Sequence, residues 1–450
     1  MSNTFRIVVH YALARGLRTW KTREQLERWQ ERRIIRHVHQ IRARSPFYRK
    51  WWDGVNASDW RRFPLIDKSI MMEHFDTLNT VGITKDEALA LAGESEETRD
   101  FKPSIQGVTV GLSSGTSGNR GIFLVSDREQ DAWTGTVLAK LLPGGLWKPA
   151  KIAFFLRANS NLYESVQRGK LQFQYFDLLE RVETLVNRLE TYQPTVWVAP
   201  PSMLRLLADA YVAGHLTAVP DKIISVAEVL DPLDRKVLEQ VFGQTVHQVY
   251  QCTEGFLGAT CRYGTLHLNE DIVHIEKEYI DPATRRFVPI ITDFSRTSQP
   301  IIRYRLNDIL TEAALPCACG SPFTAIERIE GRCDDTLYFT QLHTGEAVPV
   351  FPDFVTRSVI AASPDIEHYR VVQQGDGTME VSLRLGGSAV LEQVETDVRS
   401  ELMKLGERLE CTLPEIRFVP YTFEPGITKL RRVERRHNGV SGNSGVERYS

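Results

Sequence analysis

The sequence predicts an α/β protein with a largely parallel sheet. Between residues 108 and 331, short continuous apolar runs alternate with helical patterns, which is typical of buried parallel strands joined by helices. The apolar runs are Val108–Leu112, Ile122–Val125, Ile152–Leu156, Val196–Ala199, Ile223–Val226 and Val246–Tyr250. The helical patterns are Tyr175–Leu189, Met203–Tyr211 and Asp231–Val241. In such folds the ligand-binding groups lie on the loops at the strand ends.

Length and composition indicate an ordinary soluble globular chain with more than one domain: 450 residues, 42% hydrophobic, 25% charged and a formal net charge of −2. The near-neutral balance argues against a dedicated nucleic-acid binder. The apolar segment Ile7–Ala14 is too short to span a membrane and lacks a signal-peptide cleavage pattern. We therefore expect a cytoplasmic protein that does not bind membranes.

The segment Leu17–Trp52 combines helix-forming residues with dense charge of both signs. This pattern indicates helices with solvated faces, and an amphipathic membrane-surface helix is the alternative.

A glycine- and hydroxyl-rich run, Gly111–Gly121, lies between the first two predicted strands. Glycines let the backbone approach an anion closely, and the amides and hydroxyls supply hydrogen-bond donors, so the run suits a nucleotide triphosphate. A flexible surface turn is the alternative. No Gly-Lys-Ser or Gly-Lys-Thr follows, which excludes the Walker P-loop.

Polar residues follow several of the apolar runs. Thr253 and Glu254 come after the run that ends at Tyr250, and their oxygens suit a magnesium ion. Asp308 follows a strand-like run and can accept both hydroxyls of a ribose, while Arg303 in that run could balance phosphate charge. Lys429 lies in a basic run and could reach a transition-state anion. For each of these residues, a solvent-facing position without a ligand is the alternative.

Three of the six cysteines and one histidine form two close pairs of soft ligands. Cys261 and His267 are one pair, and Cys317 and Cys319 are the other. Three thiolates and an imidazole suit tetrahedral zinc in a closed structural site, and buried reduced thiols are the alternative.

Two further segments, Ser45–Arg49 and Phe63–Lys68, complete a series of motifs whose order resembles the adenylate-forming (ANL) superfamily. The resemblance covers nearly the whole chain. It is strongest to the branch that contains phenylacetate-CoA ligase and coenzyme F390 synthetase.

The resemblance implies a role for each motif. The glycine-rich run would embrace the triphosphate, Ala227 and Glu228 would line the adenine pocket, and Tyr250 would stack on adenine. Thr253 and Glu254 would organise magnesium, Asp308 would bind the ribose, and Lys429 would be the catalytic lysine. The residues of the run that contact phosphates would be Ser113, Ser114, Gly115, Thr116, Ser117 and Gly118.

The resemblance also implies two domains. A large N-terminal α/β adenylation domain would cover residues 1–332, and a smaller mobile α+β domain would cover 333–437, with the hinge at Asp334. Residues 438–450 are rich in Gly, Ser and Asn and are expected to form a flexible tail.

The implied reaction is ATP-dependent adenylation of a carboxylic acid, with release of pyrophosphate and transfer of the acyl group to an acceptor. The acid is expected to be aromatic or otherwise flat. Its pocket wall would be formed by Phe154, Phe155, Trp197, Val198, Ala199, Pro200, Pro201 and Phe256, with Arg157 available to polar substituents. Plain core packing is the alternative for these aromatic residues.

The acceptor stays open among coenzyme A, a carrier-protein phosphopantetheine, an amine and a reductase that uses the adenylate. Thr336–His343 lacks the Arg-Gly pair that commonly precedes the thioester-forming loop, and Asn307 replaces a common glycine. Two other functions remain as alternatives: nucleotidyl transfer to a hydroxylated aromatic compound, and a non-catalytic protein that binds a nucleotide or zinc.

Overall fold

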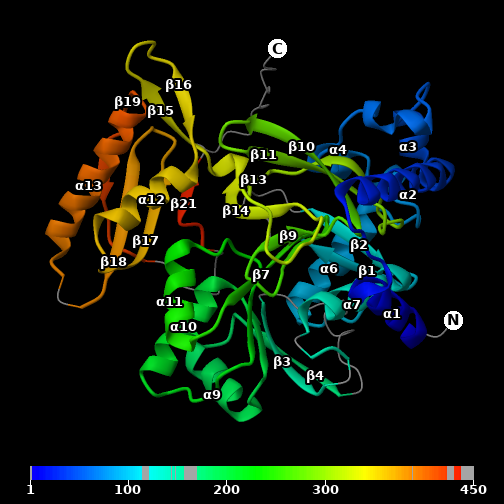
Figure 1. The fold of residues 1–450 in the computed structure, drawn as a ribbon, viewed down its shortest axis with the longest axis horizontal. Helices are drawn as coiled ribbons and strands as arrows, with labels where there is room; N and C mark the ends of the chain where they lie inside the picture. Colours follow the sequence, from blue (N-terminus) through cyan, green and yellow to red (C-terminus); the bar gives the residue numbers. More distant parts are fainter. Residues whose placement is uncertain are drawn as a thin grey trace. The chain divides into compact units, whose positions relative to one another are not determined.

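The computed structural model describes residues 3–113, 121–142, 144–146, 148–156, 170–387, 389–422 and 430–436 (Figure 1). The chain forms two compact units. The first extends to Ile329 and the second begins at Glu330, three residues before the boundary that the sequence predicts. The predicted α/β class is confirmed.

The first unit opens with a series of helices. They are α1 (Asn3–Ala12), η1 (Leu13–Leu17), α2 (Arg23–Arg44), α3 (Pro46–Trp51), η2 (Ala57–Arg62), α4 (Lys68–Glu73), α5 (Phe75–Leu78) and α6 (Lys85–Thr98). The side chain of Thr22 accepts a hydrogen bond from the Gln25 amide and so caps α2. Buried residues recur every three or four positions along α2, as expected for an amphipathic helix, and most of the remaining residues are exposed or half-buried.

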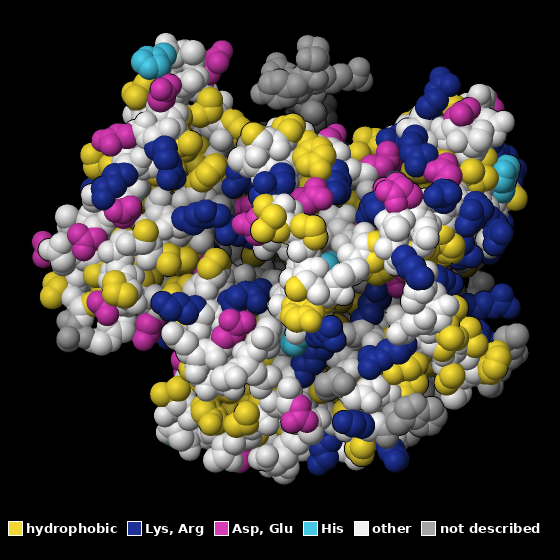
Figure 2. All heavy atoms as spheres, in the orientation of Figure 1, with side chains coloured by type: hydrophobic (Ala, Val, Ile, Leu, Met, Phe, Trp, Pro, Cys, Tyr) yellow, Lys and Arg dark blue, Asp and Glu magenta, His cyan; other side chains and the backbone are white. Residues whose placement is uncertain are grey.

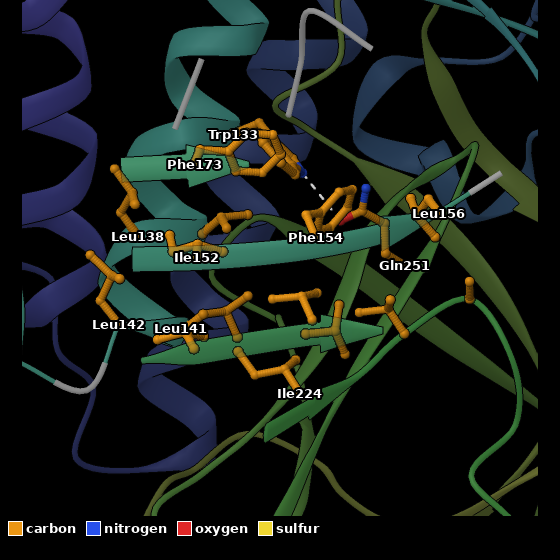
Figure 3. A pocket seen from close by; sticks show the side chains of 16 residues that line it. Trp133, Leu138, Leu141, Leu142, Ile152, Phe154, Leu156, Phe173, Ile224 and Gln251 are labelled. Atoms are coloured by element: carbon orange, nitrogen blue, oxygen red, sulfur yellow. Dashed lines mark hydrogen bonds between the residues drawn. The ribbon is translucent and has the colours of Figure 1, made fainter. Parts of the chain in front are cut away.

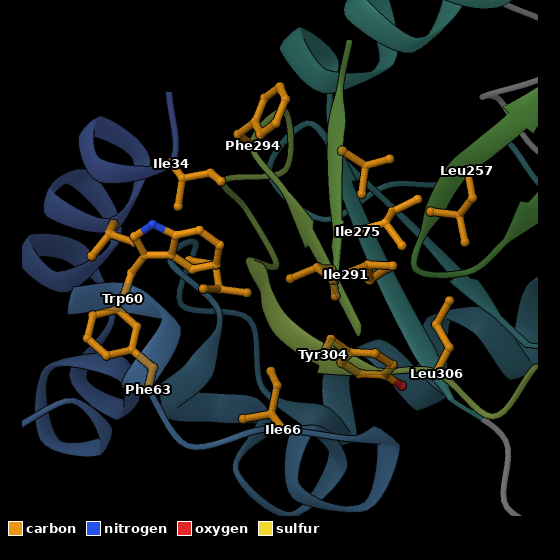
Figure 4. Packing of buried hydrophobic residues seen from close by; sticks show 14 of the residues in the cluster. Ile34, Trp60, Phe63, Ile66, Leu257, Ile275, Ile291, Phe294, Tyr304 and Leu306 are labelled. Atoms are coloured by element: carbon orange, nitrogen blue, oxygen red, sulfur yellow. The ribbon is translucent and has the colours of Figure 1, made fainter. Parts of the chain in front are cut away.

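These helices pack against the antiparallel part of a large sheet. Ile34, Trp60 and Phe63 come from the helical segment, and they join Ile291 and Tyr304 in one buried cluster (Figure 4). Trp60 and Tyr304 are at most 2% exposed. The N-terminal segment is therefore part of the core of the first unit.

The large sheet has twelve strands in the order β10-β11-β13-β14-β9-β8-β7-β6-β5-β3-β4, with β12 paired to β11. Its parallel part consists of β3 (Ala150–Leu156), β4 (Leu171–Asp177), β5 (Val196–Ala199), β6 (Lys222–Ser225) and β7 (Val246–Cys252). The other strands are β8 (Gly255–Thr260), β9 (Leu266–Leu268), β10 (Val273–Asp281), β11 (Arg286–Asp293), β12 (Ile301–Arg305), β13 (Asp308–Glu312) and β14 (Ala325–Arg332).

Helices cover both faces of the parallel part. Helices α9 (Val182–Tyr192), α10 (Pro201–Val212) and α11 (Pro232–Phe242) pack on one face, and α1 and α7 (Asp127–Leu141) pack on the other (Figure 1). The prediction of one helix over Tyr175–Leu189 is wrong at its start, because that segment begins inside β4. Leu171–Asp177 alternates apolar and polar residues, which is the strand period.

The glycine-rich run connects two antiparallel strands, β1 (Val108–Leu112) and β2 (Ile122–Ser126), which pair with each other. Ser113 and Gly121 extend this pairing past the ends of the strands. The Ser113 amide donates to the Gly121 carbonyl at 2.7 Å, and the Gly121 amide donates to Ser113 Oγ at 2.7 Å. Both ends of the run are therefore fixed.

The second unit is a small α+β unit. It contains η3 (Cys333–Asp335), α12 (Pro352–Ala362), α13 (Leu391–Arg408) and two sheets. One sheet has the order β16-β15-β19, from Ala347–Val350, Leu337–Gln341 and Cys411–Thr412. The other has the order β20-β18-β17-β21, from Ile416–Phe418, Met379–Leu385, Ile366–Gln373 and Val433–Arg435.

Strand β21, near the described end of the chain, forms an edge of this sheet by pairing in parallel with β17. Nearby, Arg431 Nη1 contacts Asp335 Oδ1 at 3.0 Å, and the Asp335 side chain is 8% exposed. The basic residues that follow Lys429 are thus held by the fold.

Candidate active site

A tight turn between β7 and β8 carries two of the predicted residues. Cys252 and Gly255 are paired across the hairpin, so Thr253 and Glu254 form the turn itself. The Thr253 hydroxyl donates to Glu254 Oε2 at 2.9 Å. The turn thus presents a hydroxyl and a carboxylate at the end of the parallel sheet, where ligands bind in open α/β folds.

Two buried tyrosines hold the carboxylates of this region. The Tyr304 hydroxyl donates to Glu254 Oε1 at 2.9 Å, and the Tyr250 hydroxyl donates to Asp308 Oδ2 at 2.6 Å. Each acceptor comes from a different part of the sequence, Glu254 from the hairpin and Asp308 from the start of β13. The fold therefore brings the two predicted acidic residues into one network.

Burial raises the pKa of Tyr250 and of Tyr304 well above the ordinary value for tyrosine. The negative charge of Asp308 adds to this effect at Tyr250, and that of Glu254 adds to it at Tyr304. Both hydroxyls consequently stay protonated at neutral pH and act as donors. The carboxylates they orient can accept hydroxyls or bind a hard cation.

Arg296 connects the hairpin turn to the strand that follows the glycine-rich run. Its Nη1 donates to the Thr253 carbonyl at 3.2 Å, and its Nη2 donates to the Leu124 carbonyl of β2 at 3.1 Å. Gln299 adds a second link, because its Nε2 donates to the Ile122 carbonyl at 3.0 Å. The base of the run and the Thr253–Glu254 turn are therefore parts of one site.

Glu129 anchors the loop that carries Arg296. Its Oε2 accepts from the Ser126 amide and hydroxyl at 2.8 and 2.7 Å, and its Oε1 accepts from the Ser298 amide at 2.7 Å and from the Thr297 amide. Burial alone would raise the pKa of Glu129, but the positive charge of Arg296 and these amides hold it below the ordinary value.

A lysine lies at the base of the run. A Cβ added to Gly121 would be 3.1 Å from Lys68 Cε and 3.5 Å from Ser113 Oγ. The segment that carries Lys68 is fixed to β12, because the Ile66 amide donates to the Arg303 carbonyl at 3.1 Å and the Arg305 amide donates to the Ile66 carbonyl at 2.8 Å. Lys68 thus adds a cation where the run begins and ends.

Several predicted site residues lie outside the described part of the chain. They are Ser114, Gly115, Thr116, Ser117, Gly118, Arg157 and Lys429. Asp334, the predicted hinge, lies in η3 of the second unit, five residues after the end of the first.

The four predicted soft ligands come together at the end of β8. Their ligand atoms all lie within 4.8 Å of one another: Cys261, His267, Cys317 and Cys319. Cys319 Sγ is 3.3 Å from His267 Nε2, and the Sγ atoms of Cys261 and Cys317 are 3.7 Å apart. His267 Nδ1 lies 3.1 Å from the Phe323 carbonyl, and such a contact orients the ring so that Nε2 can bind a metal ion. The donor set fits a tetrahedral metal site.

Comparison with known proteins agrees with this arrangement. None of the protein-family models matches the chain. The chain is 24% identical over 394 residues to the phenylacetate-coenzyme A ligase of Thermus thermophilus, which covers 80% of each protein. Among solved structures, a 2-hydroxyisobutyryl-CoA ligase in the postadenylation state, in complex with 2-HIB-AMP, superposes with a TM-score of 0.68 at 18% identity, covering 91% of this chain and 89% of that one.

A second solved structure, the acyl acid amido synthetase AtGH3.15 in complex with 2,4-DB, superposes with a TM-score of 0.62 at 12% identity. The superposition covers 98% of this chain and 95% of the synthetase chain. The chain has the fold of the ANL adenylate-forming superfamily. The fold predicted from the order of the motifs is therefore confirmed.

In this ANL fold, a cavity of about 120 Å³ lies between the parallel sheet and helix α7 (Figure 3). Sixteen described residues line it, and Gln251 is the one polar residue among them. The others are Trp133, Val137, Leu138, Leu141, Leu142, Ile152, Phe154, Leu156, Phe173, Val196, Val198, Ile224, Val226, Ala227 and Val249.

Three residues predicted for the acid pocket face away from this cavity. Phe155, Trp197 and Ala199 are fully buried in the core under α9, α10 and α11. Successive side chains of a strand point to opposite faces of the sheet, so Phe154 and Val198, which were predicted for the same wall, do line the cavity. Of each predicted pair of neighbours, only one residue faces the cavity. Phe256 packs behind the wall, in a cluster with Val137 and Ala259.

The residues predicted at the adenine side of the ANL fold occupy the turn after β6. Ala227 has a φ of 68°, an uncommon left-handed conformation for alanine that is typical of functional turns. Glu228 Oε2 accepts from the Ser202 amide at 3.2 Å, in the first turn of α10.

Arg303 serves packing rather than phosphate binding. Its Nε and Nη2 contact Glu276 Oε1 and Oε2 at 2.9 and 3.0 Å, and its Nη1 donates to the Phe63 carbonyl. The guanidinium fork is therefore engaged by a carboxylate and by the N-terminal segment, which corrects the prediction made from the sequence.

Asp293, beside the hairpin turn, should make the stability of the first unit depend on pH. Burial raises its pKa to about 6, against the opposing effects of Ser295 and Arg296. A raised folded-state pKa means that the contribution of Asp293 is fully present below the unfolded pKa of about 3.9 and is lost as the pH rises to about 6. Relative to Asp293→Asn, the wild type should lose about 2 kcal/mol of unfolding free energy between pH 4 and pH 7.

Urea denaturation of both proteins across this range measures the effect, with the exposed Asp59→Asn as control. A constant difference between wild type and Asp293→Asn would contradict it.

Several residues of the site have no signal in the sequence. Arg296, Gln299 and Glu129 act through hydrogen bonds between segments up to 177 residues apart. Tyr304 lies within the run that pointed to Asp308, but nothing in that run indicates that its hydroxyl reaches Glu254. Lys68 belongs to the segment Phe63–Lys68, for which the resemblance implies no role in the site.

Among the described residues, no helix has the length and apolar character needed to cross a membrane. On the face shown in Figure 2, basic and acidic side chains are interspersed.

Proposed function

We propose that this chain catalyses the ATP-dependent adenylation of a carboxylic acid, followed by transfer of the acyl group to a thiol. A carboxylate oxygen of the acid attacks the α-phosphorus of ATP, and the bond to the bridging oxygen of pyrophosphate breaks, so that pyrophosphate leaves with the electron pair. The protein contributes positioning and charge neutralisation.

One observation carries the proposal: Glu254 and Asp308 are oriented by two buried tyrosines beside both ends of the glycine-rich run. Asp308 would accept the ribose hydroxyls, and the run with Lys68 would hold the phosphates. Magnesium, bound by Glu254 and Thr253, would screen the phosphate charge. Lys429 would neutralise the charge that develops during attack, and a turn of the second domain at Asp334 would bring it into place.

Coenzyme A is the proposed acceptor, because the two ligases that the chain resembles are named as CoA ligases. An amine is the second candidate. The amido synthetase AtGH3.15 supports it, since that structure matches the largest share of this chain among the three comparisons.

We also propose that the Cys261–His267–Cys317–Cys319 cluster binds a structural zinc ion. Four protein ligands complete a tetrahedral shell and leave no open position for a substrate. The ion would join the end of β8 to the loop after β13, and its role would be stability rather than catalysis.

Acid-dependent exchange of pyrophosphate into ATP tests the adenylation proposal. Glu254→Gln removes a carboxylate charge from the magnesium side of the site and should raise the magnesium concentration needed for half-maximal exchange by roughly tenfold or more. Tyr304→Phe keeps that carboxylate and loses one hydrogen bond, worth about 1 kcal/mol, so its effect should not exceed about fivefold.

Equal magnesium dependence in Glu254→Gln and the wild type would remove Glu254 from the proposed role. No exchange with any acid, in a protein that binds ATP, would favour a hydroxyl acceptor or a non-catalytic protein.

A further inference from the structure

We infer that the acid carries a compact hydrocarbon tail, about the size of a benzene ring, with no polar group at its distal end. The inference rests on the proposed adenylation of a carboxylic acid and deepens it. It comes from the cavity between the parallel sheet and α7.

The composition of the wall limits the chemistry of the tail. Of the described residues that line the cavity, only Gln251 offers a polar side chain besides the indole of Trp133, and these two are joined: Trp133 Nε1 donates to Gln251 Oε1 at 3.3 Å (Figure 3). No charged side chain is among the described lining residues. A hydroxyl or charge at the far end of the tail would lose its water without gaining a partner there.

The volume limits the size of the tail. About 120 Å³ is somewhat less than the roughly 150 Å³ of an engineered apolar cavity known to bind benzene. A phenyl ring or a chain of about six carbons would fill the space. Longer or fused-ring tails would require the walls to move.

The orientation of the tail follows from the strands. Ala227 and Gln251 line the cavity, and each is next in the chain to a residue proposed for the nucleotide, Glu228 or Tyr250. In Figure 3, Gln251 and Leu156 lie at one end of the cavity, at the carboxyl ends of the strands, and Leu138 and Leu142 lie at the other. The carboxylate of the acid would therefore face Gln251, and the tail would point toward Leu138 and Leu142.

Adjacent identical residues on β6 provide a matched test. Ile224 lines the cavity and is 1% exposed, whereas Ile223 is 0% exposed and packs in the core on the opposite face of the sheet. Ile224→Ala and Ile223→Ala remove the same atoms from equally buried positions, so both should lower the Tm. Only Ile224→Ala should enlarge the space for the tail.

The experiment measures kcat/KM for pyrophosphate exchange with straight-chain acids from butanoate to decanoate, and with phenylacetate, 4-phenylbutanoate and 4-carboxyphenylacetate. We expect the wild type to prefer hexanoate and phenylacetate and to use 4-carboxyphenylacetate at least tenfold less well. One added buried methylene is worth about fourfold, so Ile224→Ala should shift the ratio of octanoate to hexanoate by about tenfold or more. In Ile223→Ala this ratio should stay within about twofold of the wild type.

Two results would overturn the inference while leaving the proposed function intact: best exchange with the polar acid, or the same shift in tail preference in both variants. Calorimetric titration with hexanoate and octanoate covers the case in which no acid supports exchange. In that case the proposed function fails, but the inference about the cavity can still be tested. It requires that hexanoate binds the wild type and that Ile224→Ala, but not Ile223→Ala, gains affinity for octanoate. Absence of binding would overturn the inference as well.

Discussion

Replacing Lys429 by alanine is expected to abolish most acid-dependent pyrophosphate exchange while leaving ATP binding largely intact. In the proposed reaction, negative charge develops on the oxygens around the α-phosphorus as the carboxylate attacks. A preorganised cation stabilises this charge far more in a water-excluded site than in solution, and loss of one such group typically costs on the order of 10²-fold to 10³-fold in rate. The affinity for ATP before the reaction depends on the other residues of the site, so the dissociation constant of ATP should change little.

The measurement is pyrophosphate exchange with a saturating acid, alongside equilibrium binding of ATP to each protein. Lys404→Ala, on the exposed face of α13, is the control for the loss of one lysine charge at a position away from the candidate site. Exchange at the wild-type rate in Lys429→Ala would exclude this lysine from the adenylation step. An equal loss of ATP binding would show that Lys429 contributes to binding ATP rather than to stabilising the transition state.

Loss of the proposed zinc ion from the Cys261–His267–Cys317–Cys319 cluster is expected to have the largest effect on stability. An ion that binds only the folded protein stabilises it by about 4 kcal/mol when its free concentration is 1,000 times the dissociation constant. Cys317→Ser replaces a soft ligand by a weakly coordinating hydroxyl. We expect the variant to contain less than one zinc per chain and to lose several kcal/mol of unfolding free energy, as should the wild type treated with a strong chelator.

Metal content by mass spectrometry and denaturant unfolding test this expectation. Cys411→Ser is the matched control, because Cys411 is a buried thiol outside the cluster. Full zinc content in Cys317→Ser, or equal stability with and without the chelator, would contradict the zinc assignment.

Much of the fold could be predicted from the sequence, because buried parallel strands are short and uniformly apolar. Val196–Ala199 is buried at every position, so its strand character is plain while its two faces look alike. This is why the sequence assigns both Trp197 and Val198 to the pocket wall, although only Val198 faces the cavity. Only the packing of α7 against one face and of α10 and α11 against the other distinguishes Val198 from Trp197.

Candidate residues could be picked out where they stand out locally in the sequence. Glu254 and Asp308 each follow an apolar run, and the structure places each of them on the hydroxyl of a buried tyrosine. The four soft ligands form two close pairs in the sequence, and their ligand atoms lie within 4.8 Å of one another. The sequence does not distinguish an arginine that faces a ligand from one that pairs with a carboxylate of the protein. Arg303, which pairs with Glu276, is therefore predicted to contact phosphate. Contacts between distant segments, such as Arg296 with Leu124, leave no pattern in the chain.

Glu129 has a further consequence for how the first unit responds to its ligands. Its carboxylate holds the first turn of α7, whose Trp133, Val137 and Leu138 form one wall of the apolar cavity. The same carboxylate holds the loop whose Arg296 grips the Thr253 carbonyl. The wall of the cavity and the Thr253–Glu254 turn thus share a single rigid anchor. We therefore expect Glu129→Gln to disturb the wall of the cavity and the Thr253–Glu254 turn together.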